Sequence, residues 1–270
     1  MTYEDIVYDR DDTGVVTITM NRPEKLNAFR AETVEEMLDA FRTAWADRGC
    51  GVVILTGAGD RAFSVGGDQS ARGEGGGYGA GPGQNSARSD LGIDVEDLHT
   101  VIRDIPKPVI AAVNGYAIGG GHVLHVICDL TVAADHARFG QVGPKVGSVD
   151  PGFGTAYLAR VVGQKKAREI WYLCRQYSAE DAMAMGLVNA VVPKERLMDE
   201  ARAWAGEILQ KSPTALKLAK ASFNADTENI RGIAALGMTG LALYYDTDES
   251  AEGTRAFQEK RAPDFGRFRK

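Results

Sequence analysis

The chain carries VIAAVNGYAIGGG at residues 109–121, an apolar run that leads directly into three consecutive glycines. Residues 109–113 of this run predict a buried strand, and the following segment, HVLHVICDL at residues 122–130, predicts a helix. The N-terminus of such a helix points unpaired N–H groups and the positive end of its dipole at a bound oxygen. Glycine suits this turn because any Cβ would hold a ligand away from the backbone.

A second glycine run has the same setting. Val65-Gly66-Gly67-Asp68 follows VVILTGAGDRAFS, whose residues 52–55 predict another buried strand. Each run can direct a backbone N–H into one shared cleft, so the pair predicts an oxyanion hole. For either run alone, the better interpretation is that the glycines only permit tight packing. The pair, together with the residues downstream, reverses that preference.

The composition is that of an ordinary soluble globular protein. Of the 270 residues, 44% are hydrophobic and 25% are charged, which is enough apolar material for one large domain with an appendage. The formal net charge of -6 gives no broad electrostatic footprint for nucleic acid. Because of this charge we expect no nucleic-acid partner, although local basic clusters at residues 165–166 and 267–270 remain candidate anion contacts.

The cysteines and the N-terminus predict a cytoplasmic protein. Cys50, Cys128 and Cys174 are odd in number and lack metal-type spacing, so we expect reduced thiols without a chemical role. The N-terminal sequence MTYEDIVYDRDD is acidic and has no long apolar run. No segment reaches the roughly 18 uninterrupted apolar residues of a membrane span, so no membrane contact is expected.

Strand and helix signals alternate over the first part of the chain. Residues 15–20 predict a strand, and residues 52–55, 109–113 and 130–133 predict further strands. This alternation predicts an α/β fold with a largely parallel, covered sheet. Apolar residues at helical spacing lie on one face at Val34, Met37, Leu38, Phe41 and Trp45.

From about Ser178 the pattern becomes mainly helical. Ser178 and Asp181 form a capping-box pattern, Gly186 suits a helix C-cap, and Ser212 precedes a proline at a first helical position. The last third of the chain is therefore predicted to be helical.

A glycine-rich stretch at residues 72–83 contains one large side chain, Tyr78. Such segments are most often flexible surface linkers. The position of this one directly after Gly67-Asp68-Gln69 favours instead an active-site flap that orders over a substrate.

Four motifs make the chain resemble the crotonase, or enoyl-CoA hydratase/isomerase, superfamily over nearly its whole length. The resemblance implies a spiral of ββα turns in residues 1–200 and a helical C-terminal region in residues 201–270 that mediates oligomerisation and completes the active site. It also implies an acyl-CoA thioester substrate, oxyanion N–H groups at Gly67 and Gly120, and a homo-hexamer built as a dimer of trimers. The motifs are NRPEKLNAF (21–29), AFSVGGDQ (62–69), KPVIAAVNGYAIGGGHVL (107–124) and FGQVGPKVGSVDPGFGTAYL (139–158).

The chain departs from the family pattern at the catalytic positions of the hydratases. Those enzymes use two glutamates to add water across a double bond, and the matching positions here are Val123 and Gly143. Hydration by the usual route is therefore not expected. The chain has instead Asp150, where hydratases usually have no acid. An aspartate before a proline is often a turn former, but a carboxylate near an oxyanion hole is a suitable general acid or base, and we favour that role.

Within the superfamily the chain resembles a small branch, 2-ketocyclohexanecarboxyl-CoA hydrolase and 1,4-dihydroxy-2-naphthoyl-CoA synthase. The shared features are GGDQ, GQVGPKVGSVD, VGQKKAREIW and YYDTDES. The resemblance favours the hydrolase, which opens a cyclic β-keto acyl-CoA to a pimeloyl-CoA type product by C–C cleavage. Ring closure of o-succinylbenzoyl-CoA by a synthase is the alternative. A non-catalytic acyl-CoA binder is a third interpretation, because fold alone does not fix function.

Hydroxyl groups complete the predicted catalytic set. Tyr78 and Tyr245 are candidate donors to the ketone and its tetrahedral adduct, since a phenol donates without carrying charge near pH 7. The resemblance implies that Tyr245 comes from a neighbouring subunit. Ser148 could hydrogen-bond the carboxylate or the substrate, and a role in stabilising the turn is equally expected. Gly143 is expected to leave room for a small species, either the reactive water or the bicarbonate that serves as base in related synthases.

The remaining predictions concern binding. Arg22 and Lys260 are the expected contacts for the phosphates of coenzyme A, or otherwise solvated cations. His122 and His125 lie three apart, but no third ligand follows at a convincing spacing, so helix packing is favoured and no metal is expected. No tightly bound cofactor is expected, because coenzyme A is part of the substrate. The acyl-pantetheine path is predicted to run along Val65, Gly66, Asp68, Gln69, Val142 and Gly143.

Overall fold

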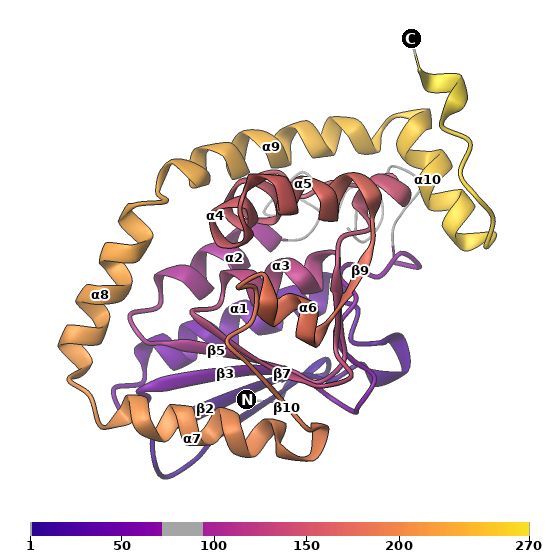
Figure 1. The fold of residues 1–270 in the computed structure, drawn as a ribbon. Helices are drawn as coiled ribbons and strands as arrows, with labels where there is room; N and C mark the ends of the chain where they lie inside the picture. Colours follow the sequence, from indigo (N-terminus) through magenta and orange to yellow (C-terminus); the bar gives the residue numbers. More distant parts are fainter. Residues whose placement is uncertain (1, 72–93, 270) are drawn as a thin grey trace.

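A six-stranded sheet forms the centre of the molecule (Figure 1). The computed structural model describes residues 2–71 and 94–269. The strand order is β1-β2-β3-β5-β7-β10; β1 pairs antiparallel with β2, and the other neighbours pair in parallel. The valine-rich and isoleucine-rich strands are covered on both faces, as parallel sheets usually are. The strands are β1 Ile6–Arg10, β2 Val15–Met20, β3 Val52–Gly57, β5 Val109–Val113, β7 Leu130–Ala134 and β10 Ala190–Val192.

A second, four-stranded sheet has the order β4-β6-β8-β9, and β4, β6 and β8 pair in parallel. Each of these three strands directly follows a strand of the large sheet along the chain, and a helical segment comes next. The chain therefore makes three successive ββα turns, as the family resemblance implies. The strands are β4 Ala62–Ser64, β6 Tyr116–Ile118, β8 Arg138–Gly140 and β9 Gln176–Ser178.

Alternate residues of the large sheet enter two separate apolar clusters. Val53 and Leu55 of β3 face the larger cluster, between the sheet and α1–α3, whereas Val52 and Ile54 face a smaller one, between the sheet and α7. This is the two-residue period of a strand covered on both sides. Figure 1 shows α7 below the sheet and α1–α3 above it. These helices are α1 Ala31–Ala46, α2 Val95–Asp104, α3 Gly120–Ile127 and α7 Leu197–Leu209.

The C-terminal helices form an arch that runs from the end of α7 through α8 and α9 to α10 (Figure 1). The arch passes over α4 Leu158–Val162 and α5 Gln164–Leu173. The predicted boundary at residues 200–201 falls inside α7, which packs against the large sheet. The arch helices are α8 Pro213–Ala225, α9 Asn229–Tyr245 and α10 Asp248–Gln258.

The two predicted N-caps are confirmed, whereas Gly186, predicted as a C-cap, lies one residue beyond the C-cap Met185 and has φ 76°. Ser178 caps α6, Ala179–Ala184, by accepting from the Asp181 N–H at 3.1 Å, and the Asp181 carboxylate accepts from the Ser178 N–H in return. Ser212 caps α8. The last third is mainly helical, with the short strand β10 as an exception. Within residues 2–71 and 94–269, no helix has both the length and the apolar character needed to cross a bilayer.

Candidate active site

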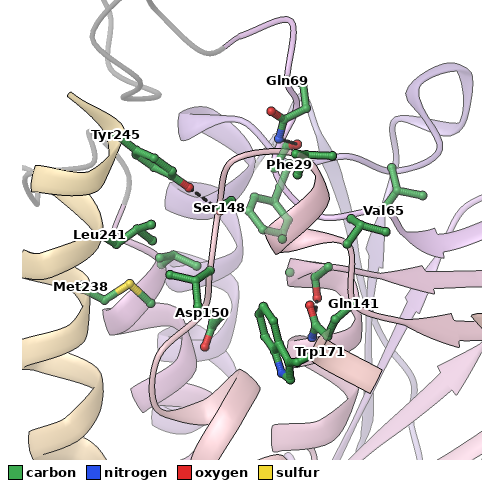
Figure 2. A pocket seen from close by; sticks show the side chains of 18 residues that line it. Phe29, Val65, Gln69, Gln141, Ser148, Asp150, Trp171, Met238, Leu241 and Tyr245 are labelled. Carbon is green, nitrogen blue, oxygen red and sulfur yellow. Dashed lines mark hydrogen bonds between the residues drawn. The ribbon is translucent and has the colours of Figure 1, made fainter. Parts of the chain in front are cut away.

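One pocket of about 100 Å³ lies where both glycine runs, the loop before α4 and helix α9 converge (Figure 2). Gly67 and Gly120, which belong to the separate runs, both line it. The predicted convergence of the two runs on one cleft is therefore confirmed.

The backbone around Gly67 leaves its N–H directed away from the neighbouring chain segment. Gly67 forms a parallel bridge with Phe29. In this bridge the Phe29 N–H donates to Gly66 O at 2.9 Å, and the Asp68 N–H donates to Phe29 O at 2.9 Å. These two bonds use the N–H and the C=O of Phe29. The Gly67 N–H therefore points away from Phe29, because successive N–H groups of an extended chain point to opposite sides.

The second amide lies at the start of α3. Gly120 is the first residue of this helix, so its N–H has no acceptor within the helix. Gly119 before it has φ 58° and ψ -125°, a conformation reserved for glycine. A Cβ on Gly66 would lie 2.7 Å from Gly120 N, and a Cβ on Gly120 would lie 2.6 Å from Phe29 Cζ. The glycines therefore serve tight packing as well, and that packing brings the two amide segments together.

Asp150 is the only carboxylate among the described residues that line the pocket. Its Oδ1 accepts from the Gly154 N–H at 2.7 Å. Although the side chain borders the pocket, loss of solvent around the carboxyl raises the Asp150 pKa to about 7, and the bond from Gly154 only partly offsets this rise. A carboxyl with this pKa can both accept and return a proton near neutral pH.

A π-helical turn, Phe153–Tyr157, holds Asp150 in place. Such turns are rare and are often found at functional sites. Trp171 on α5 fixes the turn from outside, because its Nε1–H donates to the Gly154 carbonyl while the Gly154 N–H holds Asp150. Figure 2 shows Trp171 and Asp150 side by side at the base of the pocket.

Ser148 and Tyr245 form a hydroxyl pair at the opposite end of the pocket. Their oxygens lie 2.7 Å apart, as the dashed line in Figure 2 shows. Tyr245 is the last residue of α9 and belongs to the same chain as Ser148. The expectation that a neighbouring subunit supplies this tyrosine is therefore wrong for this structure: the arch of α8 and α9 is long enough to return to its own pocket.

The two positions that match the hydratase glutamates carry no acid. Val123 is fully buried within α3. Gly143 lines the pocket, but a Cβ there would lie 2.6 Å from Ser148 O and 2.9 Å from Trp171 Cζ3. The expectation that this glycine leaves room in the direction of a side chain is corrected, because the Ser148 carbonyl and the Trp171 ring fill that space.

The predicted binding residues divide into two groups. Val65, Gln69, Val142 and Gly143 line the pocket. The others are not among the residues that line it, namely Gly66, Asp68, Arg22 and Lys260.

Of the two predicted phosphate contacts, Arg22 is enclosed by other groups of the protein and Lys260 is open to solvent. The Arg22 guanidinium is largely buried and forms an ion pair with Asp68 at 3.0 Å. Lys260 is exposed beyond the end of α10. Tyr78 and the rest of the glycine-rich stretch lie outside the described residues.

Several pocket residues were not singled out from the sequence. Phe29 lies within the NRPEKLNAF motif, and Gln141 lies within GQVGPKVGSVD, so their motifs were the available signal. Trp171 is the last residue of the VGQKKAREIW motif, so its motif was a signal as well. Met238 and Leu241 come from helix α9, where apolar residues at helical spacing predict core packing and give no sign of a pocket.

The two histidines of α3 are packing residues. His122 and His125 are fully buried, with ring centroids 4.9 Å apart, and His125 also contacts the Phe139 ring edge-on at 5.0 Å. Burial lowers the His122 pKa to about 3 and lowers the His125 pKa well below its usual value. In the described ranges, no group of three or more His, Cys, Asp or Glu side chains could hold a metal ion.

Comparisons with known proteins identify the family. A family model described as enoyl-CoA hydratase/isomerase matches residues 10–268. A solved enoyl-CoA hydratase from Mycobacterium avium subsp. paratuberculosis is 27% identical, with a TM-score of 0.84 over 98% of this chain and 99% of that chain. An enoyl-CoA hydratase/isomerase from Pseudoalteromonas atlantica is 26% identical, with a TM-score of 0.86 over 97% and 100%. An enoyl-CoA hydratase from Bacillus anthracis is 32% identical, with a TM-score of 0.74 over 96% and 98%. This chain therefore belongs to the enoyl-CoA hydratase/isomerase family of the crotonase superfamily.

Proposed function

We propose that the protein opens the ring of a cyclic β-keto acyl-CoA by hydrolysis, in the manner of 2-ketocyclohexanecarboxyl-CoA hydrolase. The observation that carries this proposal is the Asp150 carboxyl, with a pKa raised to about 7, which is the one carboxyl among the described residues that line the pocket with Gly67 and Gly120. The positions that match the hydratase glutamates are Val123 and Gly143, so neither of them supplies the acid that hydration uses. One carboxyl that passes a proton from water to carbon suits C–C cleavage.

The first step is addition of water to the ring ketone. The Asp150 carboxylate takes a proton from water, and the resulting hydroxide attacks the ketone carbon to give a tetrahedral alkoxide. The Ser148–Tyr245 pair can donate a hydrogen bond to this new oxygen, because each hydroxyl group is a donor as well as an acceptor.

The second step breaks the ring. The bond between the former ketone carbon and the carbon next to the thioester breaks, and its electron pair moves into the thioester to form an enolate. The Gly67 and Gly120 N–H groups donate to the enolate oxygen, and one such donor typically contributes about 2.7–4 kcal/mol in the transition state. Protonated Asp150 then returns its proton to the carbon. The products are a new carboxylic acid and an intact acyl-CoA thioester, so water is the only co-substrate.

The pocket suits a compact alicyclic acyl group. Its other lining side chains are mainly apolar, among them Phe29, Trp171, Met238 and Leu241. The volume of about 100 Å³ is of the same order as the roughly 150 Å³ of an apolar cavity that binds benzene. A single six-membered ring therefore fits this space better than a long acyl chain.

The remaining expectations are proposals of the same kind. Lys260 and the local basic clusters are candidate contacts for the coenzyme A phosphates. The proposed assembly is a hexamer of two trimers; exposed apolar side chains on α8 and α9, including Phe223, Leu236 and Leu243, support association. We further propose a cytoplasmic enzyme that uses water and needs no bound bicarbonate near Gly143.

Incubation with 2-ketocyclohexanecarboxyl-CoA, followed by mass spectrometry, tests the proposal. We expect a mass gain of one water, to pimeloyl-CoA, at a rate that is independent of added bicarbonate. Cyclisation of o-succinylbenzoyl-CoA without any ring opening would instead establish the synthase. Asp150→Asn provides the matched control: it should abolish turnover and retain affinity for the acyl-CoA, whereas a pure binder has no turnover to lose.

A further inference from the structure

Arg22 contacts both of the chain segments that pair at the Gly67 amide. Its Nη1 donates to the carbonyl of Ala28, the residue before Phe29, at 2.6 Å. Its Nη2 lies 3.0 Å from Oδ2 of Asp68, the residue after Gly67. The guanidinium therefore joins the two segments beside the Phe29–Gly67 bridge.

The contact is shielded from solvent on both sides. The side chains of Arg22 and Asp68 are 12% and 8% exposed, and Asp5, 3.7 Å from Arg22 Nε, is 5% exposed. Burial opposes ionisation of Asp68, but hydrogen bonds from Ser70 and Arg22 outweigh it and lower the Asp68 pKa. A planar guanidinium holds two acceptors in a fixed relative position, which one ammonium group cannot do.

We propose that Arg22 is a positioning residue: it fixes the direction of the Gly67 N–H by holding Ala28 and Asp68 together, and it does not bind the phosphates of coenzyme A. By holding the segment that contains Phe29, Arg22 also affects the position of the Gly120 amide, because the Phe29 ring packs against Gly120. The role of Arg22 depends on the proposed role of Gly67 as an oxyanion donor.

The carbonyl stretch of a bound thioester measures this role without any turnover. Cyclohexanecarboxyl-CoA, labelled with ¹³C at the thioester carbonyl, lacks the ketone that ring opening requires. Hydrogen bonds from the oxyanion hole should move its carbonyl band to lower wavenumber in isotope-edited infrared spectra. We expect this shift in the wild type and a clearly smaller shift in Arg22→Met and Asp68→Asn, with a smaller loss in Arg22→Lys.

Arg30→Met is the matched control. Arg30 also pairs with Asp5, at 2.8 Å, but the structure shows no contact between Arg30 and Asp68 among its described ion pairs. Arg30→Met should therefore keep the full carbonyl shift. Thermal unfolding of all the variants identifies any that fail to fold. With 2-ketocyclohexanecarboxyl-CoA, Arg22→Met should lose about 10- to 100-fold in kcat, since a misplacement of about 1 Å can cost about that much.

The outcomes separate the inference from the proposed function. A wild-type carbonyl shift that Arg22→Met reduces supports the positioning role, even if 2-ketocyclohexanecarboxyl-CoA is not hydrolysed. A full shift in folded Arg22→Met, with weaker binding of the CoA ester and unchanged binding of the matching pantetheine ester, would overturn it in favour of a phosphate contact. If the wild type binds the probe without any carbonyl shift, both the positioning role of Arg22 and the oxyanion-donor role of Gly67 are overturned.

Discussion

The Ser148 and Tyr245 hydroxyl oxygens lie 2.7 Å apart, although 97 positions separate the two residues in the chain. One belongs to the loop that precedes Asp150, and the other ends α9. The hydrogen bond therefore joins the C-terminal arch to the Asp150 loop of the same chain. Because Met238 and Leu241 of α9 also line the pocket, the arch supplies both a donor and part of the apolar wall.

Tyr245→Phe should reduce kcat for ring opening by about 10²-fold, since the loss of one donor to a developing oxyanion has about that effect. Ser148→Ala should show a comparable loss, because the serine orients the phenol. Steady-state kinetics of the two single variants and the double variant provides the measurement. The double variant should be little worse than either single one.

Tyr244→Phe is the control for this pair, because Tyr244 is the neighbouring tyrosine and is not among the residues that line the pocket. It should retain kcat. Fully additive losses for Ser148 and Tyr245 would show that the two hydroxyls act independently.

The rate of ring opening should depend on pH through Asp150. Its carboxylate must accept a proton from water, and its pKa is raised to about 7. We therefore expect kcat/KM to rise with pH and to level off above an apparent pKa near 7. The pH profile with 2-ketocyclohexanecarboxyl-CoA measures it, and a rate that is flat between pH 5 and pH 9 would contradict the assignment of Asp150 as base.

The same carboxyl should make stability depend on pH. Its pKa is about 7 in the folded state against 3.8 for an ordinary aspartate, so between these values the folded protein binds more protons than the unfolded chain. The free energy of unfolding should therefore fall as pH rises from about 4 to 7 and change little from this group outside that window. Urea unfolding of wild type and Asp150→Asn at several pH values measures it. The fall should be weaker in the variant.

The β-strands and the glycine turns are the parts of the fold that local sequence predicts well. Strands β2 and β5 have the predicted bounds, because continuous apolar runs between turn signals leave few alternatives. The convergence of Gly67 and Gly120 follows from the parallel pairing of β4 with β6, since turns that follow adjacent parallel strands lie close together.

Contacts between distant segments are the parts that local sequence does not predict. Arg22 was expected to bind phosphate because its positive charge and several N–H donors suit a phosphate group. Its partner Asp68 lies 46 positions away, and only the folded bridge brings them together. The prediction that Gly143 leaves open space is wrong for a similar reason, because Trp171 from a later helix fills the space beside it. The path of α9, which decides which subunit supplies Tyr245, depends on the packing of the whole arch.

Gly120→Ala should abolish most activity, because the new Cβ would lie 2.6 Å from Phe29 Cζ and would push the two amide segments apart. The loss in kcat should be about 10²–10³-fold, the range for removal of one oxyanion-hole donor. Overpacking should also cost about 1–3 kcal/mol of stability.

Gly206→Ala in α7 is the control: nothing lies within 4 Å of its added Cβ. It should keep full activity and gain roughly 0.5–1 kcal/mol, because alanine is the better helix former. Kinetics and urea unfolding of both variants measure these effects. Full activity in Gly120→Ala would mean that the amide at the start of α3 does not contact the reacting oxygen.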